Sequence, residues 1–280
     1  MHAGQVWFIT GASSGFGRAF AEHALSRGYA VVIGARNLDK LKEIERIDPV
    51  RVLAVRLDVN KHDEVRHATA AAIERFGRVD VLFNNAGYGI VGAVEETPMA
   101  ELRAQLETNF FGAVSITREF LPHFRARRSG AIVNISSLGG QLSYAGFGAY
   151  SASKFALEGL SEALAQEMKP FGVKVLIVEP GAFRTSFAGD AMKHMPSIDA
   201  YRDVVGGTRQ FARSMHNAQE GDPRKAAAAV EHALQSSETP LRLALGTDAV
   251  SSIRGHSETL LRDLATWEAV SLDTKLDDRA

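Results

Sequence analysis

The sequence predicts an α/β fold in which a parallel sheet of seven strands is covered by helices on both faces. Three observations predict it. The chain has 280 residues, 45% hydrophobic and 23% charged, which is typical of a large globular protein. Short β-branched runs recur between longer segments of helical periodicity. These runs are apolar at nearly every position, as strands covered on both faces are.

The expected elements follow from this alternation. The strands are QVWFIT from residue 5, AVVIGA from 30, VRVLAVRLDV from 50, VDVLFN from 79, GAIVNIS from 130, VKVLIVEP from 173 and LRLALG from 241. Helical periodicity covers residues 15–27, 38–46, 62–76, 98–124 and 149–168. Such βαβ units predict an open, doubly wound sheet with ligands at the carboxyl ends of its strands, near the point where strand order reverses.

The chain shows no internal repeat, low-complexity tract or linker, so we expect a single domain over residues 1–280. Aromatic residues and methionines break the βα rhythm over about 182–217, which predicts a substrate-binding lid; an ordinary surface excursion is the alternative. A helical extension is expected over about 247–280. It is amphipathic with a charged tail and could cap one side of the body and block a second interface.

Composition excludes several classes of function. A formal net charge of −1 gives no long-range field for nucleic acid or an acidic membrane surface. With zero cysteines there are no disulfides or zinc-thiolate sites, and the nine histidines lack ligand spacing, so we expect no metal. No apolar stretch approaches 18 residues, and the N-terminus lacks the features of a signal peptide. We expect a cytoplasmic protein with a small, roughly neutral substrate.

A glycine-rich turn, TGASSGFG at residues 10–17, follows the first strand and opens the first helix. There Gly11 would permit the sharp turn, Gly15 would let the backbone approach a pyrophosphate and Gly17 would allow tight helix packing. The glycines alone could mark a simple turn. In this position they predict dinucleotide binding by a Rossmann fold.

The end of the second strand indicates which dinucleotide. It reads Gly34-Ala35-Arg36-Asn37, without the carboxylate that normally accepts the adenosine ribose hydroxyls of NAD. Arg36 can pair with a 2′-phosphate, with Ser13 or Ser14 as further donors, which favours NADP(H). The alternative is a solvated charge at a strand end. Asp39 better suits the dipole of the following helix.

One tyrosine is singled out by its neighbour. Of five tyrosines, only Tyr150 has a lysine at i+4, and on a helix Lys154 would lie one turn away on the same face. A nearby ammonium favours the phenolate, so we expect the pKa of Tyr150 to be lowered toward neutrality. Tyr150 could then act as general acid in reduction and general base in oxidation. Taken alone, such a pair is usually exposed and without a role.

Seven motifs occur together in order: TGASSGFG (10–17), LDV (57–59), NNAG (84–87), TNFFG (108–112), IVNISS (132–137), YSASK (150–154) and EPGAFRT (179–185). In order and spacing they resemble the short-chain dehydrogenase/reductase family, in its single-domain branch. The resemblance covers roughly residues 5–190. It implies that Tyr150 is the proton donor, that Lys154 lowers its pKa and binds the nicotinamide ribose, and that Asn109 is the fourth catalytic position.

The resemblance also implies that Ser137 positions the substrate carbonyl. Ser136 is the adjacent alternative, but alternation along a strand lets only one of the two reach the site. The implied cofactor contacts are Gly11, Ser13, Ser14, Gly15, Phe16, Gly17, Arg36, Asp58, Val59, Asn85, Ala86, Gly87, Tyr150, Lys154, Pro180, Gly181, Phe183 and Thr185. Asp58 would hold the adenine edge, Asn85 and Gly87 the adenosine side, and residues 180–185 the nicotinamide amide.

The expected substrate pocket is mostly apolar, with walls from Leu138, Gln141, Tyr144, Phe147, Phe183 and Phe187. This favours an uncharged carbonyl or secondary alcohol of moderate size. We therefore expect an NADP-dependent carbonyl reductase or alcohol dehydrogenase. The alternative from another class is a non-catalytic, NADP-sensing interaction protein. Members of the family usually pair through helices corresponding to about 98–128 and 149–168, which implies a homo-oligomer, either dimer or tetramer.

Overall fold

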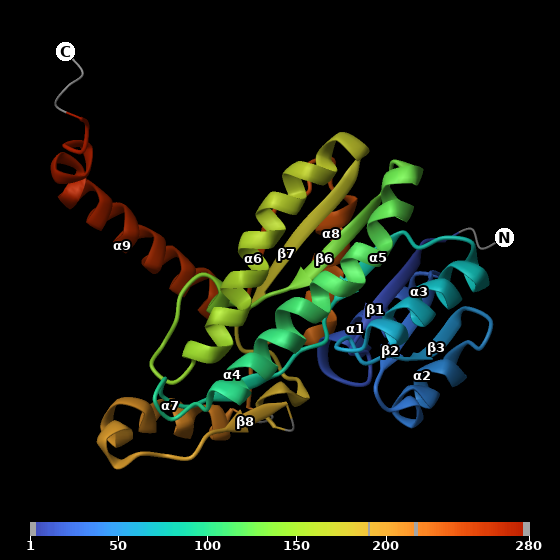
Figure 1. Cartoon of the computed structure of the whole chain (residues 1–280). Helices are drawn as coiled ribbons and strands as arrows, with labels where there is room; N and C mark the ends of the chain where they lie inside the picture. The colour runs from blue at the N-terminus through green and yellow to red at the C-terminus, as the bar shows by residue number, and fades with distance from the viewer. Residues whose placement is uncertain (1–3, 190, 216–217, 277–280) are drawn as a thin grey trace.

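The computed structural model describes residues 4–189, 191–215 and 218–276 and is built on a seven-stranded parallel sheet (Figure 1). Strand order is β3-β2-β1-β4-β6-β7-β9, and every neighbouring pair is parallel. The strands are β1 (Val6–Thr10), β2 (Ala30–Ala35), β3 (Val52–Arg56), β4 (Val81–Asn84), β6 (Gly130–Ile135), β7 (Val173–Pro180) and β9 (Arg242–Leu245). All seven expected strands are present, which confirms the predicted fold class.

The helices connect these strands across both faces. They are α1 (Gly15–Ser26), α2 (Lys42–Ile47), α3 (His62–Phe76), α4 (Met99–Leu106), α5 (Gly112–Arg127), α6 (Gly148–Met168), α7 (Arg202–Ser214), α8 (Pro223–Gln235) and α9 (Thr247–Leu272). Short 3-10 turns span Leu38–Leu41, Leu138–Gly140, Lys169–Phe171, Ser186–Ala188 and Asp199–Tyr201. The helix expected over 98–124 consists of α4 and α5 joined by a π-helical turn, Glu107–Phe111. Helix α8 was not predicted.

Alternation along the strands divides the core into two layers. In β1, Trp7 and Ile9 belong to the cluster that packs against α1, α2 and α8. Val6 and Phe8 point the other way, into the cluster formed with α3, α5 and α6. All four side chains are at most 2% exposed. Because both faces are buried, the strands can be apolar at consecutive positions, which is the pattern the sequence shows.

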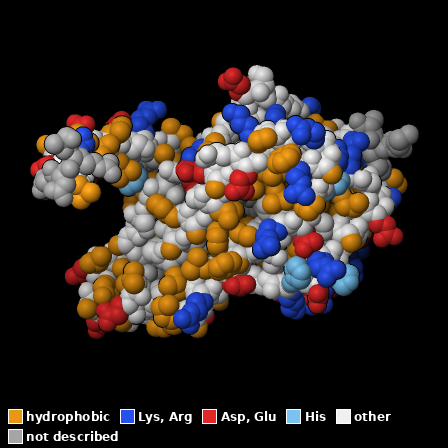
Figure 2. Space-filling view, turned by 45° about the horizontal axis from the view of Figure 1, so that its top comes forward, with side chains coloured by type: hydrophobic (Ala, Val, Ile, Leu, Met, Phe, Trp, Pro, Cys, Tyr) orange, Lys and Arg blue, Asp and Glu red, His pale blue; other side chains and the backbone are white. Residues whose placement is uncertain are grey.

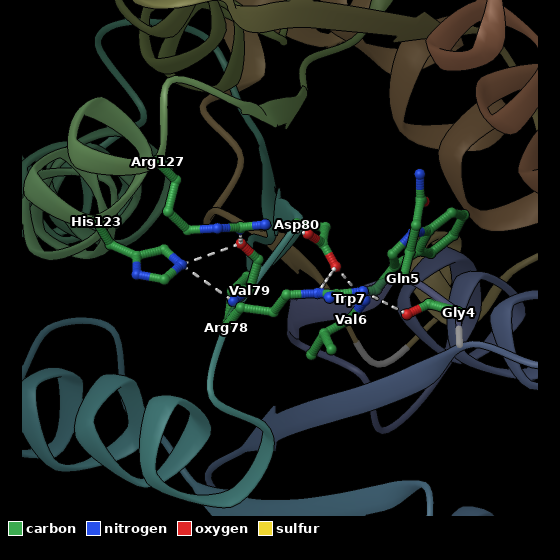
Figure 3. A network of polar contacts seen from close by, with 9 residues as sticks. All are labelled: Gly4, Gln5, Val6, Trp7, Arg78, Val79, Asp80, His123 and Arg127. Carbon is green, nitrogen blue, oxygen red and sulfur yellow. Dashed lines mark hydrogen bonds and ion pairs between the residues drawn. The ribbon is translucent and has the colours of Figure 1, made fainter. Parts of the chain in front are cut away.

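Charged residues fix the amino ends of the central strands (Figure 3). Asp80, just before β4, accepts hydrogen bonds from the backbone N–H of Val6 at 2.8 Å, from Arg78 Nε at 3.0 Å and from Arg127 Nη2 at 2.8 Å. His123 Nε2 lies 3.2 Å from both the N and O atoms of Val79. This network joins β1, β4 and α5 at the end of the sheet opposite to the loops that follow the strands.

A second, two-stranded parallel sheet lies beside the carboxyl ends of the main strands. It pairs β5 (Gly89–Val91) with β8 (Met192–His194). The pairing attaches part of the segment expected as a lid, residues 182–217, to the chain that follows β4. Helix α7 continues this segment, so the polypeptide beyond β7 returns over the same edge of the sheet as the glycine-rich turn.

Helix α9 projects from the body toward the C-terminus (Figure 1). It has 26 residues, and Ala249 is the only one of them that is buried. The expectation that this extension caps the body is therefore wrong, because the helix leaves the body after its first turns. None of the described helices is both long and apolar enough to cross a bilayer. The described residues also contain no group of three His, Asp or Glu side chains placed to hold a metal ion.

Candidate active site

The glycine-rich turn links β1 to α1 at the point where strand order reverses. Gly11 and Gly15 have φ of +64° and +55°, in the left-handed region where side chains are disfavoured. A Cβ on Gly17 would lie 2.5 Å from Gly11 O, so only glycine fits there. The side chain of Ser14 does not cap α1, and no acidic residue lies in the first turn. The N–H groups of this helix end can therefore meet an anion.

The loop after β4 is held against this turn by Thr10. Its Oγ1 accepts from the backbone N–H groups of Asn85 and Ala86, each at 2.9 Å. In return, Asn85 Nδ2 donates to Thr10 O at 2.9 Å and to Gly11 O at 3.1 Å. Asn85 thus contributes directly to the shape of the glycine-rich turn, a role that its motif did not reveal.

Asn109 lies in the π-helical turn between α4 and α5 and is 1% exposed. Its Nδ2 donates to Tyr88 O at 2.9 Å and to Ser153 Oγ at 3.0 Å, while its Oδ1 accepts from Tyr88 N at 3.1 Å. π-Helical turns inside α-helices are frequent at functional sites. The insertion turns a mid-helix asparagine toward α6, where it fixes the chain beside Gly87.

The two serines after β6 point in different directions, as alternation predicted. Ser136 is buried, and its Oγ donates to Glu158 Oε1 at 2.5 Å. Ser137 caps the short 3-10 turn Leu138–Gly140, with its Oγ accepting from Gly139 N at 3.0 Å. Ser137 lines the same cavity as Tyr150, and a Cβ on Gly139 would lie 3.4 Å from both Ser137 Oγ and Tyr150 Cε1. Ser137 is therefore the serine that reaches the tyrosine.

Tyr150 and Lys154 occupy one face of α6, with Lys154 Nζ 5.7 Å from the centre of the tyrosine ring. Burial raises the pKa of Tyr150 to about 12, against the lowering effect of Ser137. The expectation of a lowered pKa is wrong for this arrangement, because the ammonium faces the ring and donates to Ile135 O at 2.8 Å. Burial lowers the pKa of Lys154 to about 8, opposed by the charge of Glu158.

A cavity of about 560 Å³ opens at this tyrosine. Its walls come from the turn after β6, from α6, from the chain after β7, from α7 and from the start of α9. Figure 2 shows that apolar side chains cover much of the hollowed surface between the projecting helix α9 and the main body. The expected site residues along the cavity are Phe16, Asn85, Gly87, Ser137, Leu138, Tyr144, Phe147, Tyr150, Lys154, Pro180, Gly181, Phe183, Thr185 and Phe187.

Gln141 does not belong to the pocket wall, and that prediction is corrected. It is not among the residues that line the cavity, and its Nε2 donates to Glu158 Oε2 and, at 3.0 Å, to Glu179 Oε1. The turn Leu138–Gly140 places Leu138 toward the cavity and Gln141 behind it. Two buried carboxylates provide the acceptors that hold it there.

The other expected cofactor residues lie outside the cavity. Arg36 is exposed at the end of β2, and Asp58 follows β3, with its Oδ1 accepting from Asn60 N at 3.1 Å. Val59 is buried, and a Cβ on Gly112 would lie 2.5 Å from its Cγ2. Gly11, Ser13, Ser14, Gly15, Gly17 and Ala86 form the turn region beyond the cavity, and Asn109 lies behind it.

The prediction missed part of the pocket. Helix α7 contributes Gly207, Thr208, Phe211 and Ala212, and Met215 follows it; the start of α9 contributes Asp248 and Ser252. Further lining residues are Ile135, Ser136, Gly139, Leu142, Ser151, Ala182, Met192 and Gln219. The aromatic and methionine residues that suggested a lid were a usable signal for Met192, Phe211 and Met215. No sequence signal marked Asp248, whose Oδ2 accepts from Ala182 N at 2.7 Å.

Comparison with known proteins gives relatives over nearly the whole chain. The chain is 38% identical over 269 residues to Oxidoreductase BOA17 of Botryotinia fuckeliana, covering 96% of this chain and 98% of that protein. It is 40% identical over 247 residues to 3-ketodihydrosphingosine reductase of Bacteroides thetaiotaomicron, covering 86% and 88%.

Solved structures of related proteins share the fold of this chain. A short-chain dehydrogenase from Streptomyces avermitilis, 50% identical, superposes with a TM-score of 0.93 over 98% of this chain and 100% of that one. A short-chain dehydrogenase/reductase from Burkholderia phymatum in complex with NAD is 27% identical, with a TM-score of 0.81 over 93% and 96%. An alcohol dehydrogenase from Thermococcus sibiricus complexed with 5-hydroxy-NADP is 28% identical, with a TM-score of 0.71 over 86% and 95%.

The family model described as short chain dehydrogenase matches residues 5–196, more than half of the chain. The glycine-rich turn, the serine and the tyrosine–lysine pair all fall inside that range. Together with the relatives, the match shows that this chain belongs to the short-chain dehydrogenase family of NAD(P)-binding oxidoreductases.

Proposed function

We propose that this chain is an NADP(H)-dependent oxidoreductase that interconverts a carbonyl and a secondary alcohol on a moderately sized, mostly apolar substrate. The observation that carries the proposal is the largely apolar cavity that the side chains of Tyr150 and Ser137 both line. Two converging hydroxyls can bind and protonate a carbonyl oxygen.

The chain's own residues supply binding and the proton. Ser137 Oγ donates a hydrogen bond to the carbonyl oxygen and holds it beside Tyr150. Pro180 and Gly181 line the cavity and would hold the nicotinamide of the bound cofactor, which would supply the hydride for the carbonyl carbon. Tyr150 gives its phenolic proton to the oxygen as negative charge develops there. Lys154 stabilises the resulting phenolate and can bind the ribose next to the nicotinamide.

The raised pKa of Tyr150 favours the reductive direction. With a pKa of about 12, the phenol carries its proton at neutral pH and is ready to act as the acid. Lys154, with a pKa of about 8, is mostly charged at pH 7 and loses its charge in mild alkali. Turnover in reduction should therefore depend on the charge of Lys154 rather than on ionisation of the tyrosine.

The preference for NADP(H) is supported by an exposed cation just after β2. Arg36 is exposed at the end of β2, and Asp39 is engaged elsewhere, with its Oδ1 2.5 Å from Lys42 Nζ. A 2′-phosphate carries the negative charge that the Arg36 guanidinium attracts.

The substrate class follows from the cavity. Lys154 and Asp248 are the charged residues among its lining, and Asp248 is engaged by the backbone of Ala182. The remaining walls are largely apolar or aromatic, which suits aryl, steroid-like, terpenoid-like or long-chain ketones. The relative named 3-ketodihydrosphingosine reductase supports a ketone with an extended apolar chain.

The decisive variant is Tyr150→Phe. We expect it to lower ketone-dependent NADPH oxidation by at least about 100-fold, because it removes the acid but keeps the ring. Absorbance at 340 nm measures turnover over a panel of aryl, steroid, terpenoid and long-chain ketones, and NADPH fluorescence measures cofactor binding. Retained turnover would overturn the proposal. Tight NADPH binding by the wild-type protein without turnover on any carbonyl would support the NADP-sensing alternative.

Arg36→Ala tests the cofactor preference. We expect affinity for NADPH to fall about tenfold, with affinity for NADH nearly unchanged, because one charge-assisted hydrogen bond to a phosphate contributes roughly 1.5–3 kcal/mol. Lys40→Ala, in the following 3-10 turn, is the matched control for loss of one positive charge. Equal effects of Arg36→Ala on both cofactors would contradict the preference.

We also propose that the chain forms a homo-oligomer. Exposed apolar residues on the segments through which family members pair support this proposal. They are Met99, Phe111 and Phe155, which are 58%, 52% and 46% exposed. A second apolar surface runs along α9. A single domain and a cytoplasmic location stay predictions.

A further inference from the structure

Behind the pocket, two buried carboxylates face each other. Glu158 lies on α6 one turn after Lys154, and Glu179 is the residue before Pro180 at the end of β7. Each residue is 2% exposed. Neither side chain has a role in the proposed reaction, and neither was singled out by the sequence. Burying two acids this close costs free energy unless their charge is balanced or one holds a proton.

The pair is bound to the loop that carries Ser137. Ser136 Oγ donates to Glu158 Oε1 at 2.5 Å, and Gln141 Nε2 donates to both carboxylates. Between these residues, Gly140 lies so close that a Cβ would overlap Glu158 Oε1 and Ser136 Oγ. The residues on both sides of Ser137 are thus held to α6 and β7.

The charges around the pair do not balance. Arg242 on β9 reaches both acids, with its Nε 3.2 Å from Glu158 Oε2 and 3.2 Å from Glu179 Oε1. It also pairs with the exposed Glu162 through Nη2 at 2.6 Å. Lys154 is the other cation facing the pair, and its ammonium donates to Ile135 O. The guanidinium is divided among three carboxylates and the ammonium donates to Ile135 O, which leaves one of the two buried acids to hold a proton.

We propose that Glu158 and Glu179 share one proton and act as positioning residues, which hold the Ser137 loop at a fixed distance from Tyr150. Tyr150, Lys154 and Glu158 recur every four residues along one face of α6. The loop is therefore fixed to the same helix face that carries the proton donor. The expected effect on turnover rests on the proposed function, whereas the expected effect on stability does not.

Loss of the shared proton should loosen this arrangement. Burial, and then the charge of Glu158, raise the pKa of Glu179 from 4.5 to about 7. Because the folded pKa lies above the unfolded one, the contribution to stability is full below pH 4.5 and is lost as pH rises to about 7. Above that pH two negative charges repel each other beside Gln141, and the Ser137 loop loses its fixed position.

Glu179→Gln removes the titrating group but keeps the shape of the side chain. The amide keeps the shape, stays neutral and can still donate to Glu158. Between pH 5 and 7.5 the thermal midpoint of wild type should fall. The fall should be a few degrees larger than that of E179Q over the same range. With acetophenone and NADPH, kcat of wild type should fall as pH rises through 7, whereas E179Q should not show this fall. Glu162→Gln is the matched control, because it removes an exposed partner of Arg242 and should behave like wild type.

Gln141→Leu tests the hydrogen bonds that Gln141 donates to the two carboxylates. We expect kcat to drop about tenfold with KM for NADPH unchanged, because a small displacement of a reacting group can cost up to ~100-fold. Identical pH profiles of stability for E179Q, E162Q and wild type would overturn the proposal. So would an unchanged kcat in Q141L. If wild type fails to turn over acetophenone, the proposed function is in doubt, but the stability profiles still decide the proton-sharing pair.

Discussion

Two long helices of this protein, α6 and α9, have opposite environments. Helix α6 has 21 residues, of which nine are buried, and it carries Tyr150, Lys154 and Glu158. Helix α9 is longer, with 26 residues, but buries one. Apolar content does not explain the difference, because α9 contains leucines and a tryptophan. Burial follows instead from what each helix packs against.

Helix α6 fits the sheet through small and polar residues. Ser161 is fully buried, and its Oγ accepts from Asn134 Nδ2 at 2.7 Å, which is joined in turn to Asn84. Ser153, also fully buried, accepts from Asn109. Small side chains let the helix approach β6 closely, and these hydrogen bonds satisfy the polar groups that it buries. The face that carries Tyr150 and Lys154 is therefore held on a rigid support.

Helix α9 has an apolar stripe that no other part of the described chain covers. Ile253, Leu260, Leu264 and Trp267 recur at spacings of seven, four and three residues, which places them on one face. The last three are 55%, 64% and 62% exposed. A helix of this length extends about 39 Å. Exposed apolar stripes of this kind mark interaction sites, and a second copy of the chain is the partner we propose.

The strongest test of the α6 side is Lys154→Met. We expect a loss of about 100-fold or more in kcat/KM, because the variant removes the one ammonium beside the phenol and the ribose site. In wild type, kcat/KM for reduction should decline as pH rises through about 8, where Lys154 loses its charge. That decline should be absent in the variant.

Glu167→Gln provides the matched control, because residue 167 lies on the exposed side of α6. It should leave both the rate and the pH profile unchanged. An unchanged rate in Lys154→Met would show that the buried face of α6 does not carry the chemistry, and the contrast between the two helices would lose its functional meaning.

Substitutions on the apolar stripe of α9 should affect assembly more than activity. The double variant Leu264→Asp/Trp267→Asp should reduce the molar mass in solution, measured by light scattering after size exclusion. Its thermal midpoint and turnover per chain should stay near wild type, because these side chains are 64% and 62% exposed. Ala269→Asp, on the opposite face of α9, should not change the mass. An unchanged mass in the double variant would contradict assembly through α9.

Local patterns predicted the sheet and the order of its elements well. A strand between two helix layers must be apolar on both sides, so β1, β2 and β7 could be recognised from consecutive apolar residues. The helix over 98–124 was predicted, but its π-helical turn at Glu107–Phe111 was not. Helix α8 was missed, although an aspartate followed by Pro223 marks its start.

The sequence by itself determined the features that depend on spacing along the chain: the glycine-rich turn, the seven strands and the placement of Tyr150 and Lys154 on one helix face. Tertiary structure decided what depends on packing between distant segments. Burial raised the pKa of Tyr150 when a neighbouring charge was expected to lower it, and Glu158 and Glu179 turned Gln141 away from the pocket. Helices α7 and α9 joined the cavity walls from far along the sequence. Desolvation and contact geometry arise only when such segments meet in space, so no local pattern encodes them.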